Sequence, residues 1–244
     1  MSVPLIVPDW PAPSNVGAAC STREGGVSNP PYDSLNLGDH VGDDAAHVAI
    51  NRQRFVDALH AQPVFMRQVH GISVADLSGP FTEADACVTR EPGIACTIMV
   101  ADCMPLLFTD QEGTQVGAAH AGWRGLAGGV IEATLARFDE PEGVIAWLGP
   151  CIGPKHFEVG AEVKAAFERV DARAARHFRP HAEGKFLADL PALARMRLQS
   201  AGVASVHGND GADGWCTVAN ASRFFSHRRD RVSGRFAAAV WRRA

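Results

Sequence analysis

The sequence lacks several signatures that would assign a function directly. It contains neither G-x-G-x-x-G opening a helix after a strand nor G-x-x-x-x-G-K-[ST], so neither glycine loop grips nucleotide phosphates. No two histidines stand as H-x-H, which makes a cluster of several copper ions hard to build from the 10 scattered histidines. No two cysteines form a C-x-x-C pair, and the 6 cysteines are expected to be reduced thiols, mostly in the core.

Long apolar runs and a strong excess of one charge are also missing. No stretch approaches the roughly 20 apolar residues that a membrane helix needs, and the N-terminus lacks the basic and apolar regions of a secretory signal. Lys and Arg number 23 against 27 Asp and Glu, so the net charge of −4 creates no field for nucleic acid. We therefore expect a soluble cytoplasmic protein without nucleic-acid or membrane partners. Its oligomeric state has no signal in the sequence.

The order of apolar segments favours an α+β fold. Helices are expected over 45–60, 125–138, 161–170 and 190–201, with Asp43 or Asp44 capping the first and Gly202 ending the last. Strands are expected near 16–23, 64–69, 86–89, 94–100, 106–109, 116–119, 144–148, 203–207 and 236–241. Because many successive strands lack an intervening helix, mixed sheets with helices outside are favoured over a doubly wound parallel sheet. No repeat, linker or composition shift divides the chain, so residues 1–244 are expected to form a single domain.

Three potential zinc ligands each end an apolar segment that reads as a strand: His70, Cys103 and His120. Each alone is weak evidence, because the spacings match no short zinc motif and a histidine at a strand end is more often structural. Together, two imidazoles and a thiolate suit zinc, and three protein ligands leave the open position of a catalytic site. Zinc bound there would lower the pKa of a water molecule toward neutrality.

The same residues also fit a metal-free nucleophilic site. Cys103 would be the nucleophile, His70 or His120 the base, and Asp102 or Asp85 the group that orients the base. Asp85 could instead be a solvated turn residue. The residues alone leave the zinc and thiol alternatives open.

Candidate substrate contacts come from arginines beside glycines and turns. Arg124 stands at a predicted helix start, Arg23 precedes a glycine pair, and Arg228 follows an aromatic pair. Near a helix N-terminus, arginine suits a phosphate or carboxylate, although each could be ordinary surface charge. Asn36, between two leucines of a polar loop, could bind a ligand or satisfy its own turn.

A family resemblance extends from about Ala18 to Trp241. It is carried by the ordered segments STREGGVSNPPYDSLNLGDHVGDD, RQVHG, EADACVT, ADCMPLL, AAHAGWRGLAGGVIEAT, AWLGPCIGPKHFEVG, FLADLPALAR and RFFSHRRDRVSGRFAAAVW. The chain thereby resembles the family first labelled polyphenol oxidase or laccase domain. That family is now described as purine nucleoside phosphorylase with adenosine deaminase activity, and some bacterial members as peptidoglycan-editing factors.

The resemblance implies a single domain of mixed sheets sandwiched between helices in α/β/β/α layers, related to cysteine hydrolases. It implies one zinc ion bound by His70 in QVHG, Cys103 in ADC and His120 in AHAGWRG. It also implies cleavage of adenosine, inosine and methylthioadenosine with phosphate, and deamination of adenosine. The chain departs from the family pattern at His227, where relatives commonly carry Tyr, and at Val218, which leaves base preference open.

Three functional hypotheses follow. In a zinc-dependent purine nucleoside enzyme, Asp102 or Asp85 would move the proton in deamination, and Arg23 or Arg124 would hold phosphate beside the ribose C1′. The second is an amide hydrolase that edits a muramyl-peptide cell-wall precursor with the same zinc ligands. The third is a binding protein with a structural zinc site. Copper-dependent phenol oxidation is least favoured.

Overall fold

The apolar runs of the sequence form two stacked sheets in the computed structural model, which describes residues 3–80 and 83–243. The first sheet has the strand order β1-β2-β14-β6-β3. Its strands are β1 (Leu5–Ile6), β2 (Val16–Ser21), β14 (Phe236–Arg242), β6 (Ile94–Val100) and β3 (Gln62–Phe65). The sheet is mixed: β3 runs parallel to β6, whereas the other three pairs of neighbouring strands are antiparallel.

The second sheet is also mixed and has the order β13-β9-β7-β8-β5-β4. Its strands are β13 (Ser205–Gly208), β9 (Ile145–Leu148), β7 (Met104–Thr109), β8 (Val116–Ala121), β5 (Ala86–Thr89) and β4 (Val74–Asp76). The two edge pairs, β13 with β9 and β4 with β5, are parallel and the inner pairs are antiparallel. A small antiparallel sheet contains β10 (Glu158–Val159), β12 (Phe186–Ala188) and β11 (Phe178–Pro180).

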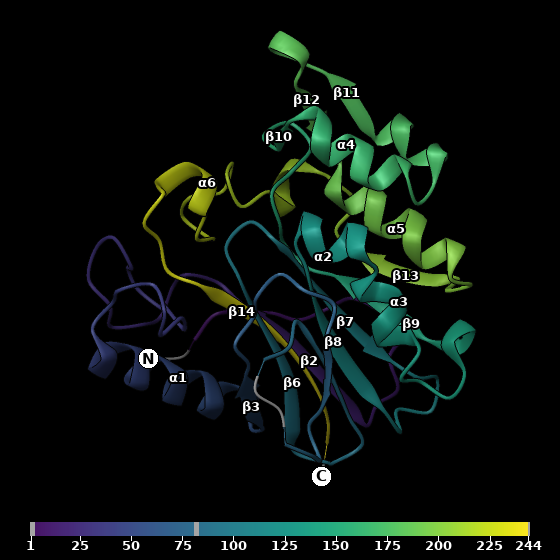
Figure 1. Cartoon of the computed structure of the whole chain (residues 1–244). Coiled ribbons are helices and arrows are strands. Elements are labelled where there is room, and N and C mark those ends of the chain that lie inside the picture. The colour runs from purple at the N-terminus through teal and green to yellow at the C-terminus, as the bar shows by residue number, and fades with distance from the viewer. Residues whose placement is uncertain (1–2, 81–82, 244) are drawn as a thin grey trace.

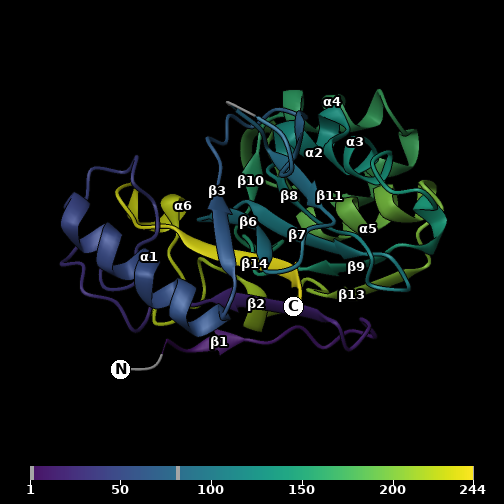
Figure 2. The ribbon, with the colours of Figure 1, turned by 90° about the horizontal axis from the view of Figure 1, so that it is seen from below.

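Helices cover the outer faces of the two main sheets (Figures 1 and 2). Helix α1 (Ala45–Leu59) lies on the first sheet, where Phe55 shares a core with Ala239 of β14. Helices α2 (Trp123–Gly128), α3 (Val130–Leu135), α4 (Ala161–Glu168) and α5 (Leu190–Ser200) lie on the side of the second sheet, and α6 (His227–Asp230) precedes β14. This arrangement confirms the predicted α+β fold, with mixed sheets between helices. No helix in the described ranges has the length and apolar character needed to cross a bilayer.

The central strands are buried on both faces, which explains their largely apolar sequences. On β7, Leu106 and Phe108 pack into the core beneath the helices, whereas Leu107 packs between the sheets. On β14, Val240 lies between the sheets and Trp241 faces the side covered by α1. Strands with two buried faces show no polar alternation. Packing in these cores fixes the position of the chain between the end of β6 and the start of β7.

Two helix boundaries lie where capping residues in the sequence predicted them, the start of α1 and the end of α5. Asp44 caps α1, because its carboxylate accepts a 2.7 Å hydrogen bond from the backbone N–H of Ala46. Such a cap contributes about 1 kcal/mol to helix stability. At the other predicted boundary, Gly202 follows α5 with a φ of 88°. That left-handed conformation is easy for glycine, so the chain turns there.

The continuous helix predicted over 125–138 is wrong. The chain instead forms α2 and α3, separated at Gly129, whose φ is 104°. A helical residue has negative φ, so one residue in this conformation ends the hydrogen-bonded run and redirects the chain. The first of the two helices also begins earlier than expected, at Trp123, which brings Arg124 into its first turn.

The prediction that three strands end at the three candidate ligands is only partly right. Strand β3 ends at Phe65, so residues 66–69 are not strand and His70 lies in an irregular segment. Cys103 immediately precedes β7, and His120 lies within β8, one residue before its end. The edge of the sheets therefore positions two of the candidate ligands, while the segment that carries His70 is held by hydrogen bonds to Asp85 and Met99.

Candidate metal centre and its pocket

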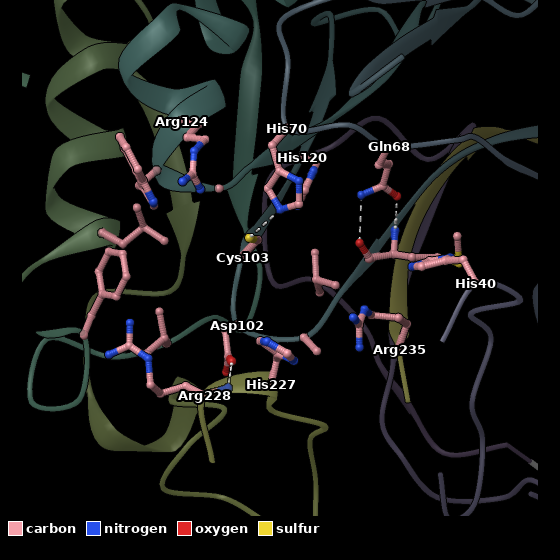
Figure 3. Close-up of a pocket in the computed structure, with 18 of the residues that line it drawn as sticks. His40, Gln68, His70, Asp102, Cys103, His120, Arg124, His227, Arg228 and Arg235 are labelled. Atoms are coloured by element: carbon pink, nitrogen blue, oxygen red, sulfur yellow. Dashed lines mark hydrogen bonds between the residues drawn. The ribbon is translucent and has the colours of Figure 1, made fainter. Parts of the chain in front are cut away.

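The structure brings His70, Cys103 and His120 together. Their donor atoms all lie within 4.8 Å of one another, and Cys103 Sγ is 3.9 Å from His70 Nε2. Zinc bonds of about 2.0–2.3 Å in tetrahedral geometry place donors roughly 3.5 Å apart, so small adjustments suffice to close the site. Two imidazoles and one thiolate within this distance can hold one metal ion (Figure 3).

A single buried carboxylate organises both histidines. Asp85 is 0% exposed, and its Oδ1 lies 2.8 Å from His120 Nδ1. The same side chain accepts backbone hydrogen bonds from Val69, His70 and Gly71 at 3.1, 2.9 and 2.6 Å. The bond to Nδ1 leaves Nε2 of His120 for a metal, and the backbone bonds fix the segment that carries His70. This is the carboxylate–histidine pairing that orients metal ligands.

A second side chain anchors the His70 segment to the first sheet. The amide of Gln68 donates to Met99 O and accepts from Met99 N, each at 2.9 Å. The Gln68 side chain therefore pairs with the backbone N–H and C=O of Met99 in β6 in the way that a neighbouring strand would, although residues 66–69 are not strand. His70 follows with a φ of 63°, an uncommon conformation for a residue other than glycine. The backbone at the site is held by these side-chain bonds.

The charges of the site favour a thiolate. Burial alone would raise the pKa of Cys103, but the charge of His120 and hydrogen bonds from both histidines outweigh burial and lower this pKa to about 6. Burial alone would lower the pKa of His120, but the Cys103 charge and the hydrogen bond to Asp85 raise it to about 9. Burial would also raise the pKa of Asp85, yet bonds from His120 and Gly71 hold it below its usual value. At pH values between the pKa of Cys103, about 6, and that of His120, about 9, these two side chains form a thiolate–imidazolium pair.

We expect selective alkylation of Cys103 in metal-free protein. The rate of reaction with iodoacetamide should rise with pH through a midpoint near the lowered pKa of about 6, because the thiolate is the nucleophile. Cys20, Cys96 and Cys151 are buried and their pKa values are raised, so they should stay unmodified. Peptide mass mapping after timed labelling measures both effects. A midpoint near the ordinary value of about 8.5 would contradict the proposed charge pairing.

Gly122 has a specific steric role beside the ligands. A Cβ at this position would lie 2.8 Å from Cys103 Sγ and 3.2 Å from His70 Cδ2. Both neighbours are fixed by the sheet edge and by the Asp85 bonds, so they have little freedom to move away.

We therefore expect Gly122→Ala to lower bound metal at least about tenfold, because supporting positions around metal sites have effects of this size. Metal analysis after dialysis measures the loss, and circular dichroism should show a folded protein. Gly214→Ala is the matched control, because a Cβ there meets nothing within 4 Å. Equal metal content in both variants would contradict the steric argument.

The three candidate ligands lie in a cavity of about 480 Å³, a size within the range of small-molecule sites. Asp102 also lines this cavity. Its Oδ1 accepts from Thr217 Oγ1 and its Oδ2 from the backbone N–H of Arg228, both at 2.6 Å. Asp85 is not among the described residues that line the cavity. The two carboxylates predicted as alternatives thus differ in position: Asp102 faces the cavity, and Asp85 lies behind the histidines.

Arg124 and Arg228 line the same cavity. The guanidinium of Arg124 lies over the Trp123 ring at 4.4 Å. Arg228 Nη1 donates to the carbonyls of His156 and Glu158 at 3.3 and 3.1 Å. Both predicted arginines therefore lie at the cavity with oriented side chains.

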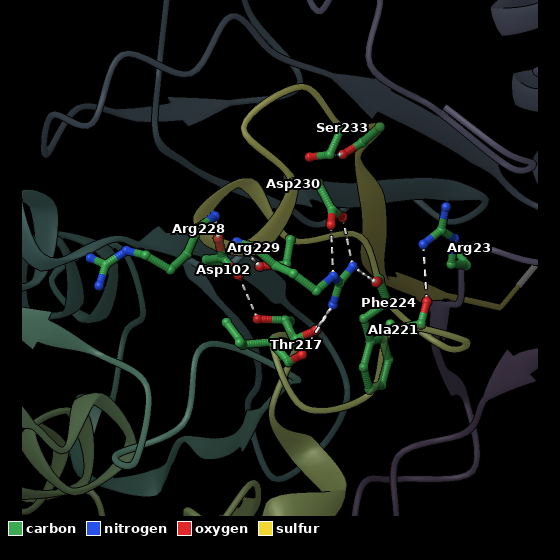
Figure 4. A network of polar contacts seen from close by, with 12 residues as sticks. Arg23, Asp102, Thr217, Ala221, Phe224, Arg228, Arg229, Asp230 and Ser233 are labelled. Carbon is green, nitrogen blue, oxygen red and sulfur yellow. Dashed lines mark hydrogen bonds and ion pairs between the residues drawn. The ribbon is translucent and has the colours of Figure 1, made fainter. Parts of the chain in front are cut away.

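Arg229 holds the segment that carries Arg228 (Figure 4). Its guanidinium donates to the carbonyls of Thr217, Val218 and Phe224 and pairs with Asp230. These bonds close the loop between residues 217 and 230 on itself. The backbone N–H of Arg228 is thereby held against Asp102 and the cavity.

Two other predicted substrate contacts are not among the described residues that line the cavity. Arg23 donates to the carbonyls of Asp33 and Ala221 at 2.8 and 3.0 Å and pairs with the Asp33 carboxylate. Asn36 is 0% exposed, and its Oδ1 accepts from Gly38 N and Arg235 N at 2.9 and 2.8 Å. Both side chains therefore connect loops of the protein.

Several cavity residues were not singled out as candidates from the sequence: His40, Gln68, Met99, Arg231 and Arg235. Arg235 stands immediately before the apolar strand that begins at Phe236, whereas Cys103 was identified at the end of an apolar run, so only strand starts would have pointed to Arg235. Gln68 lies within a segment that the sequence predicts to be strand, and nothing in that pattern indicates that its side chain bonds the backbone of Met99.

The chain is similar to known proteins over nearly its whole length. The model of the multi-copper polyphenol oxidoreductase laccase family matches residues 17–243. Purine nucleoside phosphorylase YfiH of Escherichia coli is 51% identical over 243 residues, which cover 97% of this chain and 98% of that protein. A purine nucleoside phosphorylase of Pseudomonas aeruginosa is 50% identical over 239 residues, with 97% of each chain covered.

Solved structures support the fold. The crystal structure of a Neisseria meningitidis protein superimposes with a TM-score of 0.94 at 44% identity, covering 98% of this chain and 99% of that chain. YlmD from Geobacillus stearothermophilus gives a TM-score of 0.87 at 30% identity, with coverage of 95% and 93%.

Proposed function

The chain belongs to the multi-copper polyphenol oxidoreductase laccase family, and on that basis, with the geometry above, we propose that it is a zinc-dependent purine nucleoside phosphorylase. Its proposed substrates are adenosine, inosine and methylthioadenosine, which phosphate would cleave to the free base and the ribose 1-phosphate or methylthioribose 1-phosphate. Adenosine deamination is proposed as a second activity. The names of relatives about half identical over the full length support the phosphorylase reaction. The observation that carries the proposal is a compact two-histidine, one-cysteine donor set in an arginine-lined cavity.

The donor set supports zinc rather than the copper of the family name. Two imidazoles and a thiolate with room for a fourth ligand are typical of catalytic zinc. Within residues 3–80 and 83–243, His70, Cys103 and His120 form the only group of at least three clustered donor residues, whereas several coppers need more histidines. Zinc bound there would supply a Lewis acid that lowers the pKa of a water molecule or polarises a substrate atom.

For phosphorolysis, the arginines of the cavity would bind and orient phosphate. Arg124 stacks on Trp123, and Arg228 is held by two carbonyls, so both guanidinium groups are oriented before substrate binds. A phosphate oxygen forms the bond to C1′ while the bond from C1′ to the base nitrogen breaks with its electron pair leaving on the base. Positive charge develops on the sugar in between. An oriented phosphate dianion stabilises this charge, which is a positioning and electrostatic effect.

The two carboxylates have different proposed roles. Asp102 lines the cavity, and each of its oxygens accepts one hydrogen bond, so a lone pair remains to accept a proton during deamination. Asp85 is wholly buried behind the ligands and would orient His120 and the His70 backbone. Cys103 is proposed as a metal ligand, and its lowered pKa fits a thiolate donor.

The test combines metal analysis with a substrate panel. Purified protein is assayed for zinc and copper and then incubated with adenosine, inosine and methylthioadenosine, with and without phosphate. Phosphate-dependent release of free base and ribose 1-phosphate, together with about one zinc per chain, is expected. A muramyl-serine nucleotide serves as the competing substrate for the amide hydrolase hypothesis. Serine release without phosphorolysis would overturn the proposal, and several coppers per chain would overturn the metal assignment.

A further inference from the structure

The cavity contains more positive charge than one phosphate ion requires. Four arginines line it, Arg124, Arg228, Arg231 and Arg235, whereas Asp102 is the only carboxylate among the described residues that line it. Within the described ranges none of these arginines forms an ion pair with a carboxylate side chain, and the Asp102 oxygens are bonded elsewhere. Unpaired cations that converge on a cavity favour an anionic ligand.

Arg235 is the most constrained of these cations. Its Nη1 donates to the carbonyls of Ser233 and Gly234 at 2.9 and 3.1 Å, while its backbone N–H donates to Asn36 and its carbonyl accepts from Leu37. No acceptor within the described residues bonds its Nε or Nη2. Burial lowers the pKa of this guanidinium, although nearby Cys103 and Asp102 act in the opposite direction. Holding a partly buried cation without a carboxylate partner is costly unless an anion binds there.

The position of Arg235 separates it from the arginines proposed to bind phosphate. It directly precedes β14, whose Phe236 is opposite Val100 at the end of β6. In Figure 3, Arg235, Gln68 and His40 lie on one side of the cavity, Arg124 and Arg228 lie on the other, and the metal ligands lie between the two sides. Asn36 fixes the Arg235 backbone at 2.8 Å, which gives that buried amide a positioning role. The cavity thus has cationic groups on both sides of its reactive centre.

We infer that Arg235 binds a phosphate group carried by the nucleoside itself, so that the site accepts a purine nucleoside 5′-monophosphate in addition to free phosphate. The reaction of such a monophosphate would rest on the proposed function, whereas its binding at Arg235 does not depend on it. The unbonded Nε and Nη2 of Arg235 present two N–H donors side by side, which suits phosphate oxygens. His40 is exposed and lies on the same side of the cavity in Figure 3. Inorganic phosphate would remain with Arg124 and Arg228.

The test compares inosine with inosine 5′-monophosphate, because neither can be deaminated as adenosine is. Isothermal titration of the metal-loaded full chain without phosphate should show the monophosphate binding about tenfold tighter or more, the scale of one charge-assisted hydrogen bond. In Arg235→Gln the ratio of the two affinities should fall close to one. Arg235→Lys keeps the charge but loses the paired donors and should retain part of the ratio.

Controls separate this subsite from general charge effects. Arg90→Gln removes an exposed arginine paired with Asp139 and should leave the ratio unchanged. Equal affinity of the two ligands in the unmodified protein would overturn the inference, as would an unchanged ratio in both Arg235 variants. A raised KM for inorganic phosphate without a change in the ratio would assign Arg235 to free phosphate and overturn it as well. If neither compound releases hypoxanthine with phosphate, the proposed phosphorylase reaction fails, while the affinity ratio still decides the subsite.

Discussion

Replacing Cys103 with alanine is expected to remove bound metal and to lower the proposed phosphorolysis activity by about 10³-fold, the scale of losing one main electrostatic group in an active site. Two histidines alone bind a divalent ion weakly, because the thiolate supplies the only negative charge among the three donors. The side chain is only half-buried and small, so its truncation opens no core cavity and the fold should be kept.

Three measurements on Cys103→Ala decide between a catalytic and a structural metal: zinc content, initial rate with inosine and phosphate, and thermal melting. A catalytic site predicts loss of the first two with a melting temperature within a few degrees of the unmodified protein. Cys87→Ala, in the apolar core between the sheets, is the comparison, because it should lower stability while leaving metal bound. Collapse of the fold of Cys103→Ala together with metal loss would support a structural site.

Replacing Asp85 with alanine is expected to lower both stability and metal affinity. The substitution leaves the N–H groups of Val69, His70 and Gly71 without their acceptor and frees the His120 ring. Unmade buried hydrogen bonds of this kind lower the free energy of unfolding by about 3 kcal/mol in total. Loss of the group that orients a ligating histidine lowers metal affinity about 10–100-fold.

Urea unfolding and competition with a zinc chelator measure the two effects of Asp85→Ala separately. Asp139→Asn is the control, because that carboxylate is 82% exposed and pairs only at the surface. If Asp85 acted only in proton transfer, the rate would fall while metal affinity and unfolding stayed unchanged, and that result would contradict the positioning role.

The sequence predicted best where burial alone determines structure. Residues 86–89 and 94–100 form strands at the predicted bounds, because both faces of β5 and β6 are covered and each run is apolar apart from one buried threonine, Thr89 or Thr97. The helix over 125–138 was mispredicted because glycine permits either helix continuation or a break. Only packing selects the positive φ of Gly129.

At the site, the sequence indicated chemistry better than geometry. The sequence identified Asp85 as a candidate catalytic group but did not indicate that it is buried and bonded to both histidine segments. These bonds join residues 14 to 35 positions apart in the chain, so they follow from the fold. For Asn36 the sequence allowed either a ligand contact or a side chain that satisfies its own turn; in the structure its oxygen accepts from Gly38 N in that turn and from Arg235 N across 199 residues. Arg235 itself was not singled out, because its position at the sheet edge follows from the pairing of β14 with β6.

X-ray absorption at the zinc edge of the purified full chain tests the central claim most directly. One sulfur at about 2.3 Å, two imidazole nitrogens at about 2.0–2.1 Å and one further light atom are predicted, as in a catalytic zinc site. A shell without sulfur, or one completed by a second sulfur, would contradict the assignment of His70, Cys103 and His120 as the protein ligands of an open metal site.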